Sequence, residues 1–282
     1  MSRLGSQVPL SRRFPAIRPA AIRAHQLRRL WRWHRDTASG RVTWATQQAA
    51  PLPVRTQRHA SLLLRELGES EMWMQHNKVT NLRLASAHTD GLLIRPGETF
   101  SFNKVVGNCT RRKGYVDGMR LSEGEAIAGV GGGICQLANL IHWMVLHSPL
   151  TVVERSEHSF DPFPDNGRVL PWGVGCSIVW NYVDLVVRND TDVTFQLRTG
   201  VGERHLEGEL RASGELPVSY HVRAEGERFT RGEDDEIWRS NEIWRTLVDR
   251  HTGTPVADEL VKVNRARVKY PVDAALVAEP AG

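Results

Sequence analysis

A run of three glycines followed closely by a cysteine limits, more than any other feature, how this chain can fold. Gly131, Gly132 and Gly133 precede Cys135 in the stretch GVGGGICQ. Consecutive glycines permit backbone conformations that other residues rarely adopt. The following residues, LANLIHWMVLH, place apolar side chains at helical spacing, and Pro149 comes soon afterwards. The pattern predicts a tight turn that leads into an amphipathic helix, with Cys135 in its first turn.

That position makes Cys135 a candidate nucleophile. The unpaired N–H groups at a helix start favour a negative group, so we expect the thiol to ionise more readily than a free cysteine. His158 follows on the predicted strand TVVERSEHS and is the candidate base. Asp161 or Asp184 would orient its ring, and Gln136 would donate to a developing oxyanion. In the alternative interpretation Cys135 is a small buried residue at a tight helix entry and His158 is a surface histidine.

Residues that would contact a substrate can be proposed around the same turn. Gly131, Gly132 and Gly133 would let a substrate carbonyl come close, Arg155 could hold a carboxylate bidentately, and Ser101 lies on a predicted short strand nearby. The glycines do not form a nucleotide-binding loop, since the Lys and Ser/Thr of that motif are absent. We therefore expect no cofactor.

A metal site is not expected either. Cys109, Cys135, His158 and Cys176 could be combined into one, but the close ligand pairs typical of structural zinc do not occur among them. Three cysteines are an odd number that fits a reducing compartment, so Cys109 and Cys176 should be unpaired.

Four motifs in this chain resemble the VanW family, in order and in spacing: RPGETFSFNKVVGN, GVGGGICQ, VVERSEHS and NYVDLVVRNDT. That family is found with bacterial glycopeptide-resistance genes, so the resemblance implies a role in resistance or in cell-envelope metabolism. Together with the Cys135 arrangement, it suggests a cysteine-dependent acyltransferase or hydrolase acting on a peptidoglycan-type peptide or its precursor. The alternative is a non-catalytic accessory or binding protein in which GGGICQ is a structural turn, so the question of an enzyme stays open.

Charge is concentrated in the N-terminal part. Residues 1–70 hold 13 Arg, no Lys and 3 acidic residues, a net +10, while the whole chain carries only +5. No nucleic-acid-binding motif accompanies the arginines, so we expect no nucleic-acid partner. The stretch from Ala21, AIRAHQLRRLWRWHRDTA, predicts a basic amphipathic helix, which could touch a lipid surface weakly or cap the domain. Without an apolar run of 18 residues or a secretory leader, we expect a cytoplasmic protein, with peripheral contact at the inner membrane surface as one option.

The overall prediction is a mixed α+β fold in which the Cys135 helix packs on an antiparallel sheet. A basic arm and helix (residues 1–55) precede a core domain (56–200) and a β-rich C-terminal extension of the same domain (201–282). Within the core, we expect a helix from His59 to Leu67. We also expect the part before about Pro51 to be dispensable for folding, because its prolines and arginines offer little to bury.

Overall fold

The helix that begins at Cys135 packs on an antiparallel sheet, as the sequence predicts. The computed structural model describes residues 18–64, 72–122, 125–156, 160–165, 169–232 and 234–278. Helix α5 (Cys135–Leu146) contacts β2 (Val54–Leu62) and β11 (His205–Ala212) of a sheet ordered β2-β11-β10-β3, with β10 at Phe195–Val201 and β3 at Leu93–Ile94. A Cβ on Gly208 would lie 2.8 Å from the Met144 Cε atom, so the helix lies directly on the β11 backbone. The fold class is therefore confirmed.

A second sheet shares this core. Its order is β1-β4-β9-β7, with β1 at Thr43–Trp44, β4 at Glu98–Ser101, β9 at Val186–Arg188 and β7 at Thr151–Glu154. Phe100 and Val187 are fully buried beside the α5 residues Leu137 and Ile141. Burying such side chains stabilises the fold by roughly 1.5–3 kcal/mol each, so both sheets depend on α5.

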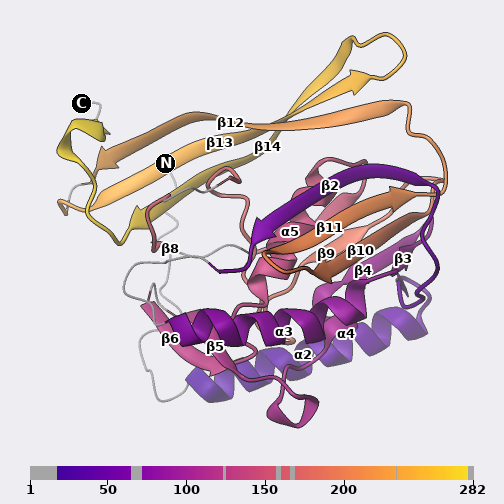
Figure 1. Ribbon diagram of the computed structural model, residues 1–282, viewed down its shortest axis with the longest axis horizontal. Coiled ribbons are helices and arrows are strands. Elements are labelled where there is room, and N and C mark those ends of the chain that lie inside the picture. The colour runs from indigo at the N-terminus through magenta and orange to yellow at the C-terminus, as the bar shows by residue number, and fades with distance from the viewer. Residues whose placement is uncertain are drawn as a thin grey trace, which may run out of the picture.

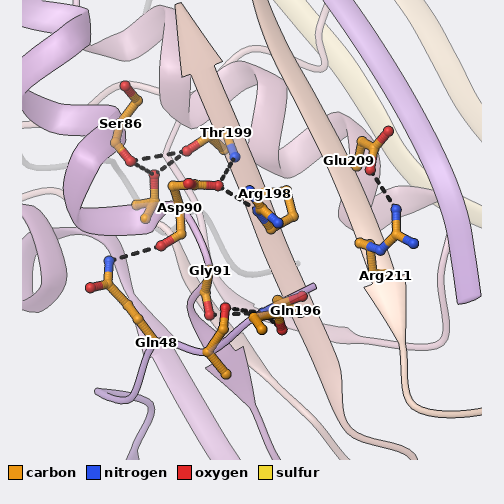
Figure 2. Close-up of polar contacts among 12 residues, drawn as sticks. Gln48, Ser86, Asp90, Gly91, Gln196, Arg198, Thr199, Glu209 and Arg211 are labelled. Atoms are coloured by element: carbon orange, nitrogen blue, oxygen red, sulfur yellow. Dashed lines mark hydrogen bonds and ion pairs between the residues drawn. The ribbon is translucent and has the colours of Figure 1, made fainter. Parts of the chain in front are cut away.

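Helix α3 (Met72–Thr89) joins the core sheet to the hairpin of β5 (Asp117–Ser122) and β6 (Glu125–Val130). Figure 2 shows how its C-terminal end is fixed to β10: the Asp90 carboxylate accepts from Arg198 Nε at 2.7 Å and from the Thr199 N–H at 3.1 Å, and Gln196 Nε2 donates to the Gly91 carbonyl. Two short segments, α4 (Phe102–Val106) and the 3₁₀ turn η2 (Arg111–Lys113), connect β4 to this hairpin. This hairpin leads directly into the glycine turn before α5.

The C-terminal part is a separate sheet of long strands that arches over the core in Figure 1. Its order is β15-β12-β13-β14-β8, with β12 at Val218–Arg231, β13 at Ile237–Asp249 and β14 at Pro255–Val268, and with β15 at Val277–Ala278 after the short turn η3 (Ala274–Leu276). The edge strand β8 (Phe160–Asp161) comes from the core part of the sequence and pairs with the end of β14. The two parts are therefore joined by a shared sheet. The β-rich C-terminal part is confirmed.

A buried arginine strengthens that junction. Arg239 of β13 is 1% exposed, and its Nη1 atom lies 3.0 Å from Asp161 Oδ2 in β8. Glu227 of β12 also accepts from the guanidinium, and the Tyr270 hydroxyl donates to Asp161 at 2.8 Å. Because a buried charge needs partners to offset its lost hydration, this cluster holds the segment after β8 firmly against the sheet.

The expectation of a helix from His59 to Leu67 is wrong over the described residues. His59 to Leu62 belong to β2, which pairs with β11 along its whole length. Residues 65–67 lie outside the described residues. The leucine-rich sequence from Leu62 to Leu64 has a high helix propensity, but such local propensity is a weak preference. The pairing of β2 with the eight-residue strand β11 overrides it.

Helix α2 (Arg18–Ala38), the predicted basic helix, is docked on the core. Its Arg29 is only 7% exposed, donates to the Glu154 carboxylate and lies 3.5 Å from Asp184 Oδ2. Its Leu27 and Trp31 are exposed, so the predicted contact with a lipid surface stays a prediction. No helix among the described residues is long and apolar enough to cross a membrane. We expect the part before about Pro51 to be dispensable for folding, but the ion pairs of Arg29 with the core argue against this for residues 18–50.

We predict that Arg29→Met destabilises the protein by about 3 kcal/mol, because it leaves the buried Asp184 carboxylate and the partly exposed Glu154 carboxylate without their cation. The exposed neighbour Arg28 supplies the matched control: Arg28→Met should change stability by less than about 0.5 kcal/mol. Urea unfolding at neutral pH measures both. Equal, small effects of the two substitutions would show that α2 is not part of the cooperative fold.

Candidate functional site

The turn before α5 is built by glycines that no other residue could replace. Gly131 and Gly133 have positive φ angles of 74° and 92°. A Cβ on Gly132 would lie 2.1 Å from the backbone of Gly118 in β5, and one on Gly133 would lie 2.1 Å from Lys78 Cγ. Asn81 of α3 adds a hydrogen bond from Nδ2 to the Gly132 carbonyl at 2.9 Å. These contacts give the glycines a packing role, beside the predicted role in substrate approach.

A cavity of about 780 Å³ opens beside this turn. One wall belongs to the core: the end of β2, Gly131 and Gly133 of the turn, and the first residues of α5. The opposite wall belongs to the β8 loop, the segment 169–180 and residues 264–266 of β14. Aromatic and proline side chains such as Trp172 and Pro171 line this second wall. Such a concave, mostly apolar space with a few polar groups is typical of a ligand site.

Cys135 lies in the wall of the cavity, half-buried, at the start of α5. Burial raises the pKa of its thiol, because desolvation disfavours the thiolate. The backbone N–H of Ile178 and the guanidinium of Arg120 act in the opposite direction, but more weakly. The expectation of an easily ionised thiol is therefore wrong in direction, since burial outweighs the helix start. Neither Cys109 nor Cys176 forms a disulfide, as expected, and neither does Cys135.

The other residues predicted for the reaction are engaged elsewhere or are not described. His158 lies outside the described residues, so its distance from Cys135 stays open. Gln136 Nε2 donates to Ser61 Oγ at 2.7 Å and to the Leu62 carbonyl at 2.8 Å, which fixes it against β2. Asp161 lies in the cavity wall but is paired with Arg239 and Tyr270, as described above.

Asp184 and Ser101 form a structural cluster. Ser101 Oγ donates to Asp184 Oδ2 at 2.6 Å, and the N–H groups of Asn103 and Leu185 donate to Oδ1 at 2.9 Å. Ser101 also caps α4 by accepting from the Lys104 N–H. Neither Asp184 nor Ser101 lines the cavity, so the structure separates both from Cys135.

Arg155 also has a structural partner. It directly follows β7 and donates from Nη2 to the Gly173 carbonyl at 2.6 Å. It thereby holds the segment that carries Trp172 in the cavity wall. The structure thus brings Cys135, Gln136, Asp161 and the glycine turn to one cavity, and places Arg155 behind its wall.

Sequence reasoning missed two residues of this cavity. Arg120 of β5 lines it, and its charge acts on the thiols of both Cys109 and Cys135. It makes no ion pair with a carboxylate in the part of the chain that the structure describes. Asn264 of β14 is 2% exposed and donates to Asn241, which itself donates to the Trp172 carbonyl. An asparagine inside a strand was the available signal for this network, because an unpaired amide there would be costly.

No group of three or more His, Cys, Asp or Glu side chains among the described residues could hold a metal ion.

Comparison with known proteins identifies a family and relatives of similar sequence. The family described as "VanW like protein" matches residues 77–211, which include the glycine turn, α5 and nearly all of β11. The chain is 35% identical over 202 residues to the Vancomycin B-type resistance protein VanW of Enterococcus faecalis, covering 72% of this chain and 73% of that protein. The chain belongs to the VanW family.

The chain is also similar to the Uncharacterized protein YoaR of Bacillus subtilis, with 40% identity over 96 residues. That match covers 33% of this chain and 32% of that protein. No solved structure matches this VanW-family chain.

Asp184 should make stability depend on pH. Burial raises the pKa of its carboxyl to about 6, from an ordinary value of 3.8. The folded protein therefore holds this proton more tightly than the unfolded chain, and stability falls as the pH rises from 3.8 through 6. We predict that Asp184→Asn removes this dependence, so that the variant gains on the order of 2 kcal/mol relative to the native protein between pH 4 and pH 7.5. Urea unfolding across this range checks it, and parallel curves for the two proteins would contradict it.

Cys135 should be a slow thiol at neutral pH. Because burial raises its pKa, its alkylation rate should rise with a midpoint above the value of about 8.5 of a free cysteine. Arg120→Gln should raise the midpoint further, since the guanidinium favours the thiolate. Iodoacetamide labelling at a series of pH values, read site by site by mass spectrometry, measures it. A midpoint well below 8 would restore the activated thiol expected from the sequence.

Proposed function

We propose that this VanW-family protein binds a carboxylate-bearing peptide of the cell envelope, a peptidoglycan-type stem or its precursor, in the cavity between the core and the C-terminal sheet. The observation that carries the proposal is the cavity itself, about 780 Å³, with the Arg120 guanidinium in its wall and no carboxylate paired to it among the described residues. A guanidinium binds a carboxylate through two parallel hydrogen bonds. The assignment of the ligand to the cell envelope is supported by the name of the Enterococcus faecalis relative, a vancomycin resistance protein.

Among the residues that the sequence offers for a reaction, those that the structure describes favour ligand binding over catalysis. Gln136 is held by Ser61 and Leu62, and Asp161 is held by Arg239 and Tyr270. The Cys135 thiol is stabilised in its neutral form by burial. A preorganised nucleophile would need a base and an orienting group directed at it. Gln136 and Asp161 instead form hydrogen bonds with other residues of the protein, and these bonds hold the cavity walls in place. A rigid binding site requires such support.

Acyl transfer or hydrolysis by Cys135 is the second candidate. One observation favours it: the backbone N–H of Ile178 faces the sulfur at the start of α5, inside the cavity. Donors of this kind can stabilise a thiolate or an oxyanion. The sulfur would add to a peptide carbonyl, form a thioester and release an amine that takes up the thiol proton. Water would then release the acid, or an amine would accept the acyl group.

Binding can be tested with the peptidoglycan stem pentapeptide and its C-terminal amide. We expect the acid to bind the native protein, measured by calorimetry, at least about 10-fold more tightly than the amide, because a charge-assisted hydrogen bond contributes roughly 1.5–3 kcal/mol. Arg120→Gln should remove this preference. Arg112→Gln, an exposed arginine of η2 outside the cavity, is the matched control and should keep it.

Two results would contradict the proposal. One is that neither peptide binds the native protein at millimolar concentration. The other is that Arg120→Gln and Arg112→Gln affect the acid equally. The second candidate is tested by incubating the pentapeptide with the native protein and with Cys135→Ser. Amine release by the native protein but not by the variant would establish catalysis by Cys135. An unchanged peptide after prolonged incubation with the native protein would contradict catalysis and leave peptide binding as the function.

A further inference from the structure

The strand β2 has a free edge that runs into the cavity. It is the terminal strand of the sheet β2-β11-β10-β3 and pairs only with β11 among the described residues. In Figure 1 it lies at the outer border of that sheet, next to the C-terminal sheet. Its residues 59–62 line the cavity, and Ala60 and Leu62 are exposed. An accessible strand edge offers a row of backbone donors and acceptors for another strand.

The register of β2 identifies the backbone groups at this edge. Leu63 N donates to the Arg204 carbonyl, so Leu63 faces β11 with its hydrogen-bonding groups. In an antiparallel pair this role alternates along the strand. Ser61 and His59 therefore also face β11, and the N–H and C=O groups of Leu62 and Ala60 point outward. The Gln136 contact agrees with this assignment, because its amide donates to the Leu62 carbonyl from outside.

Gln136 thus already occupies the position that the backbone amide of an added strand would take. Its Nε2 atom lies 2.8 Å from the Leu62 carbonyl, a distance normal for a strand hydrogen bond. The next outward groups along the edge are those of Ala60, whose small side chain leaves them accessible. Among the described residues no backbone hydrogen bond from outside β2 reaches them.

We propose that the ligand of the cavity is an extended peptide that adds to the outer edge of β2 at Ala60, beside the start of α5. The inference rests on the proposed function and specifies how the peptide is held. Strand addition supplies main-chain hydrogen bonds for affinity, while pockets along the edge select side chains. A peptide bound in this way passes the Gln136 amide and the neighbouring Cys135.

The shared chemistry, a peptide backbone with a carboxylate, can come from the mixed-chirality envelope stem or from an ordinary polypeptide. Two probes separate the sources: the stem pentapeptide and acetyl-tetra-alanine with a free carboxylate. Acetyl-tetra-alanine has the regular backbone of an antiparallel ladder, whereas the stem has alternating chirality. Because the proposed function assigns the envelope stem to this cavity, we expect the stem pentapeptide to bind at least as tightly as acetyl-tetra-alanine. Binding of acetyl-tetra-alanine alone would assign the edge to an ordinary polypeptide and contradict the proposed function.

The test blocks the edge without breaking the sheet. Ala60→Pro removes the outward N–H, which the β2–β11 ladder does not use, and proline is tolerated on edge strands. We expect it to weaken binding of acetyl-tetra-alanine at least about 5-fold, the loss of one hydrogen bond together with the steric block. Ala60→Ser keeps the N–H and should bind within about 2-fold of the native protein. Thermal melting confirms that both variants are folded.

A second measurement uses only the native protein. Acetyl-tetra-alanine N-methylated at its first and third residues is compared with the peptide methylated at its second and fourth, since only alternate N–H groups face a neighbouring strand. One of the two methylated peptides should fail to bind, and the other should bind like the unmethylated peptide. Equal binding of both patterns, or no difference between Ala60→Pro and Ala60→Ser, would overturn strand addition while the proposed function stands. Failure of every probe to bind would instead overturn the proposed function.

Discussion

Direct backbone contact between the glycine turn and β5 determines where α5 begins. Gly132 and Gly118 lie so close that a Cβ on either would meet the backbone of the other within 2.7 Å. The hairpin β5–β6, the turn and the start of α5 are therefore one rigid unit, closed on the α3 side by Asn81. Cys135 takes its place in the cavity from this packing. A side chain anywhere in the turn would move the thiol, the hairpin and the cavity wall together.

The opposite wall depends on charge rather than on close packing. Burial of Arg239 in the junction of the two parts costs the hydration free energy of its guanidinium. The carboxylates of Asp161, Asp165 and Glu227 around it offset this cost. The same cluster holds the loop after β8 next to the Trp172 segment. The proposed ligand site then lies between two walls of different origin. Gln136 and Asp161, two of the residues expected from the sequence to take part in a reaction, are held by hydrogen bonds within these walls.

The sequence predicts those features that local chemistry decides. The turn, α5, α2 and the β-rich C-terminal part follow from glycine spacing and apolar periodicity. The nature of β2 does not, because its strand state depends on pairing with β11, about 150 residues away. The sequence predicts the wrong direction for the pKa of the Cys135 thiol for a related reason: a helix start is visible in the sequence, whereas the burial that outweighs it is contributed by distant segments. The sequence likewise offers Asp184 as a residue that could orient His158, whereas the structure shows its carboxylate beside Arg29 and hydrogen-bonded to Ser101, both brought to it by other parts of the chain.

The central claim is that the core and the C-terminal sheet form one ligand site, and hydrogen exchange tests it most directly. Backbone exchange is followed with and without a saturating peptide, either the stem pentapeptide or acetyl-tetra-alanine. The account predicts slower exchange at residues 59–62 and 131–136 of the core and, at the same peptide concentration, at residues 264–266 of β14. Slower exchange on one wall alone, or only in segments outside the cavity, would contradict a site shared between the two parts.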